Sequence, residues 1–303
     1  MELDRTFVAI RERSGSELLD LALLVCRRHG LGLLAIAAPA VACFMAVNTV
    51  TYLLWFPEQL QPTPGDSGDW RFLCELTSLT MLILVEAPLA LAGVTAFLGK
   101  AVFMERPLVR LVTKELWETA TSLLYFQGIR RFSLLMPVLA VFTVLRVDET
   151  ERESWWWLGW VILVVVLFVR SMRPFLIELI VLERAPRKAR RSADVPLAQR
   201  SQQLHRAQED WLGRAVSNGV VAVVLAMMGV GTMQFLIGPL VHLLPAAVGQ
   251  LVELIGIQTA LWTVAVYMTA HRFLTYLDLR IRHEGWEVEL LLRAEAARWE
   301  AAE

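Results

Sequence analysis

Six long apolar runs dominate this sequence, and each is a candidate for crossing a membrane. A bilayer whose hydrocarbon core is about 30 Å thick is spanned by about 20 helical residues. Lipid offers no hydrogen-bond partner to backbone N–H and C=O groups, so an open chain crosses it as α-helices. The 303-residue sequence therefore predicts an all-α, polytopic membrane protein with six transmembrane helices, at residues 30–56, 76–98, 128–146, 155–177, 216–241 and 249–272.

The composition excludes a water-soluble fold. Apolar residues make up 56% of the chain, charged residues 19%, and the mean hydropathy of +0.51 is well above what a soluble globule of this size needs for its core. A secreted or cytosolic soluble enzyme is therefore excluded. The net charge of −1 shows no basic excess that would indicate a nucleic-acid partner. The expected partner is the lipid bilayer.

Lysine and arginine are distributed unevenly between the segments that flank the predicted helices. Twenty-four of them lie in residues 1–29, 99–131, 178–215 and 272–303, whereas the alternate loops contain three. Cytoplasmic loops carry the excess of Lys and Arg in multi-pass proteins, and a tryptophan cluster at 155–157 suits the aromatic belt of the opposite face. The pattern predicts a bacterial inner (cytoplasmic) membrane protein with both termini cytoplasmic.

Amphipathic segments flank the predicted transmembrane bundle of residues 30–272. Residues 1–29 contain an amphipathic helix that begins near Ser16, and residues 105–127 show a similar pattern. Both flanking helices are expected to lie on the membrane surface. The basic segment at about 183–213 has no core-forming pattern, so we expect a cytoplasmic linker or a short surface helix there.

Two periodicities compete in the cytoplasmic segment 273–303. Apolar and charged residues alternate over 277–290, which is typical of a hairpin. The Ala, Glu, Arg and Leu content and the spacing of Leu277 and Ile281 favour a helix that continues from the sixth span, with a weak point at Gly285. We expect the helix.

Alanines at a four-residue spacing mark one side of the first predicted span, at Ala38, Ala42 and Ala46. Small residues allow two helices to approach closely and promote helix packing in membranes. We therefore expect another helix of the bundle to contact this stripe.

Three segments of the chain resemble a known family. Residues 16–30 (SELLDLALLVCRRHG) resemble the opening of a family of bacterial multi-pass proteins, which is named after the glycerophosphoryl diester phosphodiesterase membrane domain. Residues 276–290 (YLDLRIRHEGWEVEL) resemble the ending of the same proteins. The segment at 173–184 (RPFLIELIVLER) adds to the likeness. The resemblance implies a six-helix bundle and partnership with other membrane proteins. It implies the bundle alone, because the chain lacks the barrel-forming length and the His-Arg-Gly motif of the catalytic phosphodiesterase domain.

Glu86 is the strongest candidate for a functional residue. It is the eleventh residue of the 23-residue run at 76–98, near mid-bilayer, and Pro88 follows it closely. A carboxyl group there needs a partner or a proton, and Arg170 in the fourth predicted span is the expected opposite charge. Two interpretations stay open. The favoured one is a buried ion pair that specifies helix packing, and the other is a site for a substrate, an ion or a proton.

Arg173 and Glu253 are secondary candidates. Arg173 follows Arg170 by about one turn and is expected to extend to the cytoplasmic headgroups, whereas Glu253 lies close to the outer surface. The five histidines and three cysteines are dispersed, without the spacing of a metal site. No catalytic or nucleotide-binding motif is present, so no metal, cofactor or enzymatic activity is expected.

These features favour a non-enzymatic integral membrane scaffold or assembly subunit of a membrane complex, with other membrane proteins as partners. The first alternative is a transporter or channel that uses the Glu86 and Arg170 pair. A mid-membrane charge supports transport, and the lack of a recognisable inverted repeat argues against it. The second alternative is a membrane anchor of a lipid-handling enzyme, which would require a catalytic partner because this chain offers no catalytic constellation.

Overall fold

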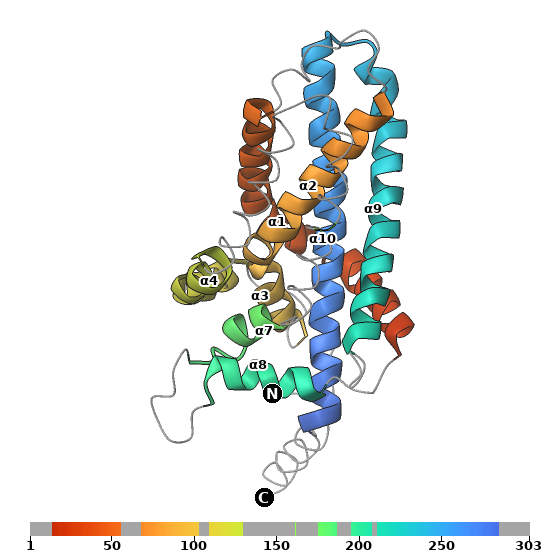
Figure 1. Cartoon of the computed structure of the whole chain (residues 1–303). Coiled ribbons are helices and arrows are strands. Elements are labelled where there is room, and N and C mark those ends of the chain that lie inside the picture. Colours follow the sequence, from red (N-terminus) through yellow and green to blue (C-terminus); the bar gives the residue numbers. More distant parts are fainter. Residues whose placement is uncertain are drawn as a thin grey trace, which may run out of the picture.

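A computed structural model describes residues 14–55, 68–102, 109–129, 161, 175–186, 195–207 and 211–284 of the chain (Figure 1). Within these residues every regular element is a helix, which confirms the all-α prediction for this part of the chain. The elements are α1 (Gly15–Trp55), α2 (Gly68–Ala90), α3 (Ala92–Ala101), α4 (Val109–Leu123), the π-helical turn η3 (Leu124–Ile129), α7 (Leu176–Val181), α8 (Leu197–Ala207), α9 (Trp211–Val241) and α10 (Ala246–Glu284).

Three of the described helices are long and apolar enough to cross a membrane, namely α1, α9 and α10, and the bent pair of α2 and α3 makes a fourth candidate. The pair of α9 and α10 runs side by side along the molecule, and α2 crosses α10 obliquely (Figure 1). The predicted spans at 128–146 and 155–177 lie almost entirely outside the described residues. Six crossings therefore remain a prediction.

Helix α1 changes direction at His29, whose backbone angles (φ −103°, ψ 15°) are not helical. The bend comes where the sequence predicts that a flanking helix meets the first span. The segment before it is held against α10, because the Tyr267 hydroxyl donates a 3.0 Å hydrogen bond to the Leu19 carbonyl. Leu18 and Ala22 are buried in the same contact region. The early part of α1 is thus a packed element of the bundle.

The second predicted span is interrupted in the structure. The run at 76–98 reads as one helix in the sequence, but α2 and α3 meet at Leu91 with a bend of 48°. Pro88 lies just before the break and has no N–H to continue the ladder, which weakens the last turn of α2. The break leaves the C-terminal end of α2 inside the apolar part of the bundle.

Short helices gather at one end of the long ones, where α3, α4, α7 and α8 contact one another or α10 (Figure 1). The basic segment at 183–213 includes α8, so its helical alternative is the one observed. The prediction that this segment has no core-forming pattern was wrong. Leu197, Ser201 and Leu204 lie on one face of α8, and all three are buried. At the chain's end, α10 continues to Glu284, which favours helix over hairpin for 277–284 and leaves 285–290 outside the described residues.

In the part of the chain that the structure describes, no other helix covers the alanine stripe of α1. Ala38, Ala42 and Ala46 are all exposed in the described structure. Close packing of α1 instead uses Gly32, since a Cβ atom placed there would overlap the Phe97 ring of α3. Phe97 is 2% exposed and also packs edge-on against His29, at a centroid distance of 6.1 Å. The ring therefore fixes the bend of α1 against α3.

We expect Gly32→Ala to lower the free energy of unfolding by about 1–3 kcal/mol, because the added methyl overpacks a site whose neighbouring ring is itself confined. Gly30→Ala is the matched control, since a Cβ at Gly30 meets nothing within 4 Å. That control should be neutral or stabilise the helix by up to about 1 kcal/mol. Denaturant titration of both variants in detergent measures the difference. Equal effects of the two substitutions would contradict this packing.

Candidate functional site

Glu86 is held by a neutral side chain in the described structure. The Asn48 Nδ2 of α1 donates a 2.9 Å hydrogen bond to Glu86 Oε2 of α2, so two crossing helices are joined at this point. Asn48 is 1% exposed. The predicted partner Arg170 and the secondary candidate Arg173 both lie outside the described residues, so their positions relative to Glu86 stay predictions.

A second amide, that of Gln258 on α10, bonds the α1 residue next to Asn48. Thr49 follows Asn48 directly, and its Oγ1 accepts a 3.0 Å hydrogen bond from Gln258 Nε2 of α10. Gln258 is fully buried, and within the described part of the chain neither its Oε1 atom nor Asn48 Oδ1 has a hydrogen-bond partner. Two consecutive residues of α1 thus connect this helix to α2 and to α10, and two of the amide oxygens involved have no donor in the described structure.

Further polar residues extend this line toward the ends of α9 and α10. Glu253 accepts a 2.8 Å hydrogen bond from Gln234 Nε2 of α9. Tyr52, one turn after Asn48 on α1, forms a hydrogen bond with Glu75 of α2. Glu75 also interacts electrostatically with Glu253, a like charge. We call the eight residues that line these helices the polar seam: Asn48, Thr49, Tyr52, Glu75, Glu86, Gln234, Glu253 and Gln258.

A second cluster joins α7, α8 and α10 near the opposite end of the bundle. Its deepest contact is the ion pair between Glu178 Oε1 and Arg272 Nε, at 2.8 Å. Glu178 is 0% exposed, and among the described residues Glu178 Oε2 and Arg272 Nη2 have no hydrogen-bond partner. This single-contact geometry makes the pair sensitive to the loss of either member.

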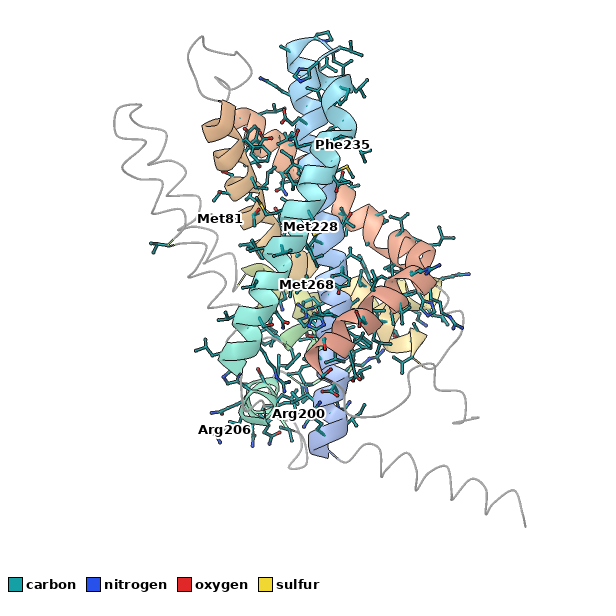
Figure 2. The ribbon with its side chains drawn as sticks, turned by 90° about the vertical axis from the view of Figure 1, so that its right-hand side faces the viewer. Met81, Arg200, Arg206, Met228, Phe235 and Met268 are labelled. Atoms are coloured by element: carbon teal, nitrogen blue, oxygen red, sulfur yellow. The ribbon has the colours of Figure 1, made fainter. Side chains whose placement is uncertain are left out.

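Glu183 is the centre of the same cluster. Arg200 of α8 forms two hydrogen bonds with its carboxylate, at 2.8 and 3.2 Å, and the Tyr276 hydroxyl of α10 donates a third at 2.6 Å. Arg280 Nε lies 3.8 Å away. One carboxylate therefore ties α8 and α10 to the end of α7. Arg200 lies on α8 at the lower end of the view in Figure 2.

Salt bridges extend this base toward α4. Arg184 follows Glu183 with a φ of 49°, a left-handed conformation that turns the chain at the end of α7. Its guanidinium lies 3.3 Å from Glu118 of α4, and Lys100 of α3 lies 3.0 Å from Glu115. Together these contacts link α3, α4 and α7. We call the residues Lys100, Glu115, Glu118, Glu178, Glu183, Arg184, Arg200, Arg272, Tyr276 and Arg280 the charged base.

Two of the segments that carry the family resemblance meet in the charged base. The segment at 173–184 contributes Glu178 and Glu183, and the segment at 276–290 contributes Tyr276 and Arg280. The sequence pattern of both segments is recognisable, but it assigns no role to these side chains. The available signal is a pair of glutamates five residues apart in an otherwise apolar stretch, LIELIVLE at 176–183.

The surroundings of Glu183 predict a specific loss of stability in acid. Burial would raise the pKa of Glu183, but the hydrogen bonds from Arg200 and Tyr276 and the charges of Arg200 and Arg280 hold this pKa below its ordinary value of 4.5. A carboxyl group whose pKa is lower in the folded state stabilises the fold above its unfolded pKa. This stabilisation is lost as the pH falls below 4.5 and through the folded value.

We therefore expect the wild type to lose more unfolding free energy than Glu183→Gln between pH 6 and pH 3, because the variant has no carboxyl group to titrate there. Denaturant unfolding in detergent at a series of pH values measures both. Parallel pH profiles would show that Glu183 keeps its ordinary pKa in the folded chain.

Comparison with known protein families, with curated proteins and with solved structures found no match to this chain. The family resemblance of the three segments therefore stays a prediction.

Proposed function

We propose that this chain is a non-enzymatic integral membrane scaffold or assembly subunit, with six spans and both termini in the cytoplasm of a bacterium. The observation that carries the proposal is the outward surface of α9. This helix contacts α10 along its length, and Val230 is the only buried residue among its described side chains. Met228 and Phe235 are 64% and 82% exposed and lie on the surface that faces the viewer in Figure 2.

The charged base supports the same role. Its carboxylates and guanidinium groups pair with one another across α3, α4, α7, α8 and α10, so these charges fix the helices relative to one another. A bundle that is braced at one end and presents a long apolar helix on its side suits a subunit that docks other membrane proteins. Polar residues on that surface, such as Ser217, would add helix-to-helix hydrogen bonds within the membrane.

Photo-crosslinking in native membranes tests the scaffold role. A photoreactive residue at Phe235 should give one discrete protein adduct, whereas the same residue at buried Val230 should give none beyond the chain itself. The adduct partner should also co-purify stoichiometrically in mild detergent. Adducts with lipid alone at Met228, Phe235 and Leu236, together with purification of the chain by itself, would refute the proposal.

The orientation is tested separately. In a variant whose native cysteines are replaced by serine, a cysteine at position 67 should react with an impermeant maleimide from outside intact cells. A cysteine at position 192 should react only after the cells are opened, because the 24-to-3 distribution of Lys and Arg places 178–215 in the cytoplasm. Equal reactivity of the two positions would contradict the six-span topology.

Transport is the second candidate function, and the polar seam favours it. Glu75, Glu86 and Glu253 lie on helices that are apolar enough to cross a membrane, and each is held by a neutral side chain: Tyr52, Asn48 and Gln234. Ionisable residues within transmembrane segments often mark pathways for ions or protons, and Glu86 lies near the middle of its predicted span. Ion flux in proteoliposomes that is abolished by Glu86→Gln, in a variant of unchanged stability, would favour transport over the scaffold role.

A further inference from the structure

The region around Asn48 and Glu86 has an unusual balance of donors and acceptors. Glu86 receives one hydrogen bond from the Asn48 amide, which carries no charge. A carboxylate within a transmembrane bundle costs at least about 2.5 kcal/mol on the most lenient insertion scale, so a compensating positive charge is expected nearby. The described residues that bond Glu86 supply a dipole instead.

Two buried amide oxygens, on Asn48 and on the partner of the next residue Thr49, have no hydrogen-bond donor among the residues that the structure describes. Asn48 Oδ1 belongs to the same amide group that bonds Glu86, and Gln258 Oε1 belongs to the amide that bonds Thr49. Asn48 and Gln258 are 1% and 0% exposed, so water does not satisfy them from the surface. A buried acceptor without a partner costs about 1–3 kcal/mol. Glu86 and Gln258 bond two consecutive residues of α1, so a carboxylate and two such acceptors occur in one region of the bundle, and together they suit a group that attracts oxygen atoms.

The end of α2 adds a third contribution. Glu86 lies in the last turns of α2, which stops at the break at Leu91 inside the bundle. The C-terminal end of a helix carries partial negative charge on its carbonyl groups and favours a cation. In membrane transporters, Na⁺ is coordinated where a spanning helix is broken in this way.

We propose that Glu86, Asn48, Thr49 and Gln258 form a binding site for a single dehydrated monovalent cation, with Na⁺ as the best match. The carboxylate supplies one negative charge, and the two amide oxygens and the threonine hydroxyl supply neutral oxygen ligands, as a hard cation requires. One carboxylate neutralises one positive charge, which disfavours a divalent ion. The site does not depend on the scaffold role, because a bound cation can stabilise the junction of α1, α2 and α10 without being transported.

The test is thermal unfolding of the purified full chain in detergent at pH 8. NaCl is exchanged for choline chloride at constant ionic strength, and binding of radioactive ²²Na⁺ is measured in parallel. The wild-type midpoint should rise with Na⁺ and saturate, and choline should have no effect because it is too large. Asn48→Leu and Gln258→Leu should each raise the half-saturating Na⁺ concentration roughly tenfold or more, the value expected from losing one ligand to a charged group.

Glu86→Gln should abolish both the Na⁺ response and ²²Na⁺ binding. Glu253→Gln is the matched control, because Glu253 is also held by a neutral amide, and this variant should keep both. If Glu86→Gln fails to fold, the two leucine variants decide the question by their half-saturating concentrations.

Three outcomes would overturn the proposal. The first is an identical wild-type midpoint in Na⁺ and choline without ²²Na⁺ binding, and the second is a midpoint that responds to pH but not to Na⁺, which indicates a protonation site. The third is a loss of stability in Arg170→Met with no Na⁺ response in the wild type. In that case Arg170, the partner that the sequence suggests, supplies the positive charge that balances the Glu86 carboxylate.

Discussion

Arg272→Met should lower the free energy of unfolding by about 3–5 kcal/mol, because it leaves the Glu178 carboxylate buried without a counter-charge. Glu178 is 0% exposed, whereas the Arg272 side chain is 17% exposed. Glu178→Gln should therefore cost less than Arg272→Met, since the guanidinium that remains is closer to solvent. The two effects are unequal because the two side chains differ in their access to water.

The double variant Glu178→Gln, Arg272→Met should recover part of this loss, because no uncompensated charge remains. Glu118→Gln is the control, since Glu118 pairs with Arg184 while about half exposed, and such pairs contribute about 1 kcal/mol or less. Denaturant titration in detergent gives all four values. Additive losses from the two single substitutions would show that the pair is not coupled.

Trp262→Ala should cost about 3–5 kcal/mol, the usual range for removing a fully packed tryptophan. Trp262 lies on α10 and is 2% exposed, and its ring packs against Phe44 of α1 at a centroid distance of 6.3 Å. The substitution leaves a cavity between the two helices that lipid cannot enter. Contacts of this kind hold membrane helices together, because apolar burial adds little within the bilayer.

Trp117→Ala provides the comparison for this prediction. Trp117 of α4 is 83% exposed, so its removal creates no cavity within the bundle. Its effect on the midpoint of thermal unfolding in detergent should be small, whereas Trp262→Ala should lower that midpoint by many degrees. Similar shifts for the two variants would mean that α1 and α10 are not packed through Trp262.

The helices themselves were largely predictable, and their interruptions were not. Apolar runs at 30–56, 216–241 and 249–272 correspond to parts of α1, α9 and α10, because hydropathy reports directly on lipid contact. The bend at Leu91 was missed although Pro88 was noted, since proline in a membrane helix is often accommodated without a break. A break depends on which neighbouring helix takes up the freed backbone groups.

Burial of polar residues was the least predictable part of the site. The depth of Glu86 in its predicted span marks it as a candidate, but nothing in the sequence singles out its bonding partner Asn48, because amide side chains commonly join helices within a membrane. Glu178 was missed because it follows directly after the predicted end of the fourth span, where a glutamate is expected to meet water. Its burial depends on α10 and on neighbouring α7 side chains, whose contacts no local pattern reports.

The connection between α9 and α10 has a consequence for how the protein enters its membrane. Residues 215–252 contain no Asp, Glu, Lys or Arg, and the turn is closed by hydrogen bonds from the Leu243 and Leu244 N–H groups to Leu240 and Val241. Translocating such a turn exposes no formal charge to hydrocarbon. The two helices can therefore insert together as one preformed hairpin, after which the other helices assemble on the free side of α10 without separating the pair.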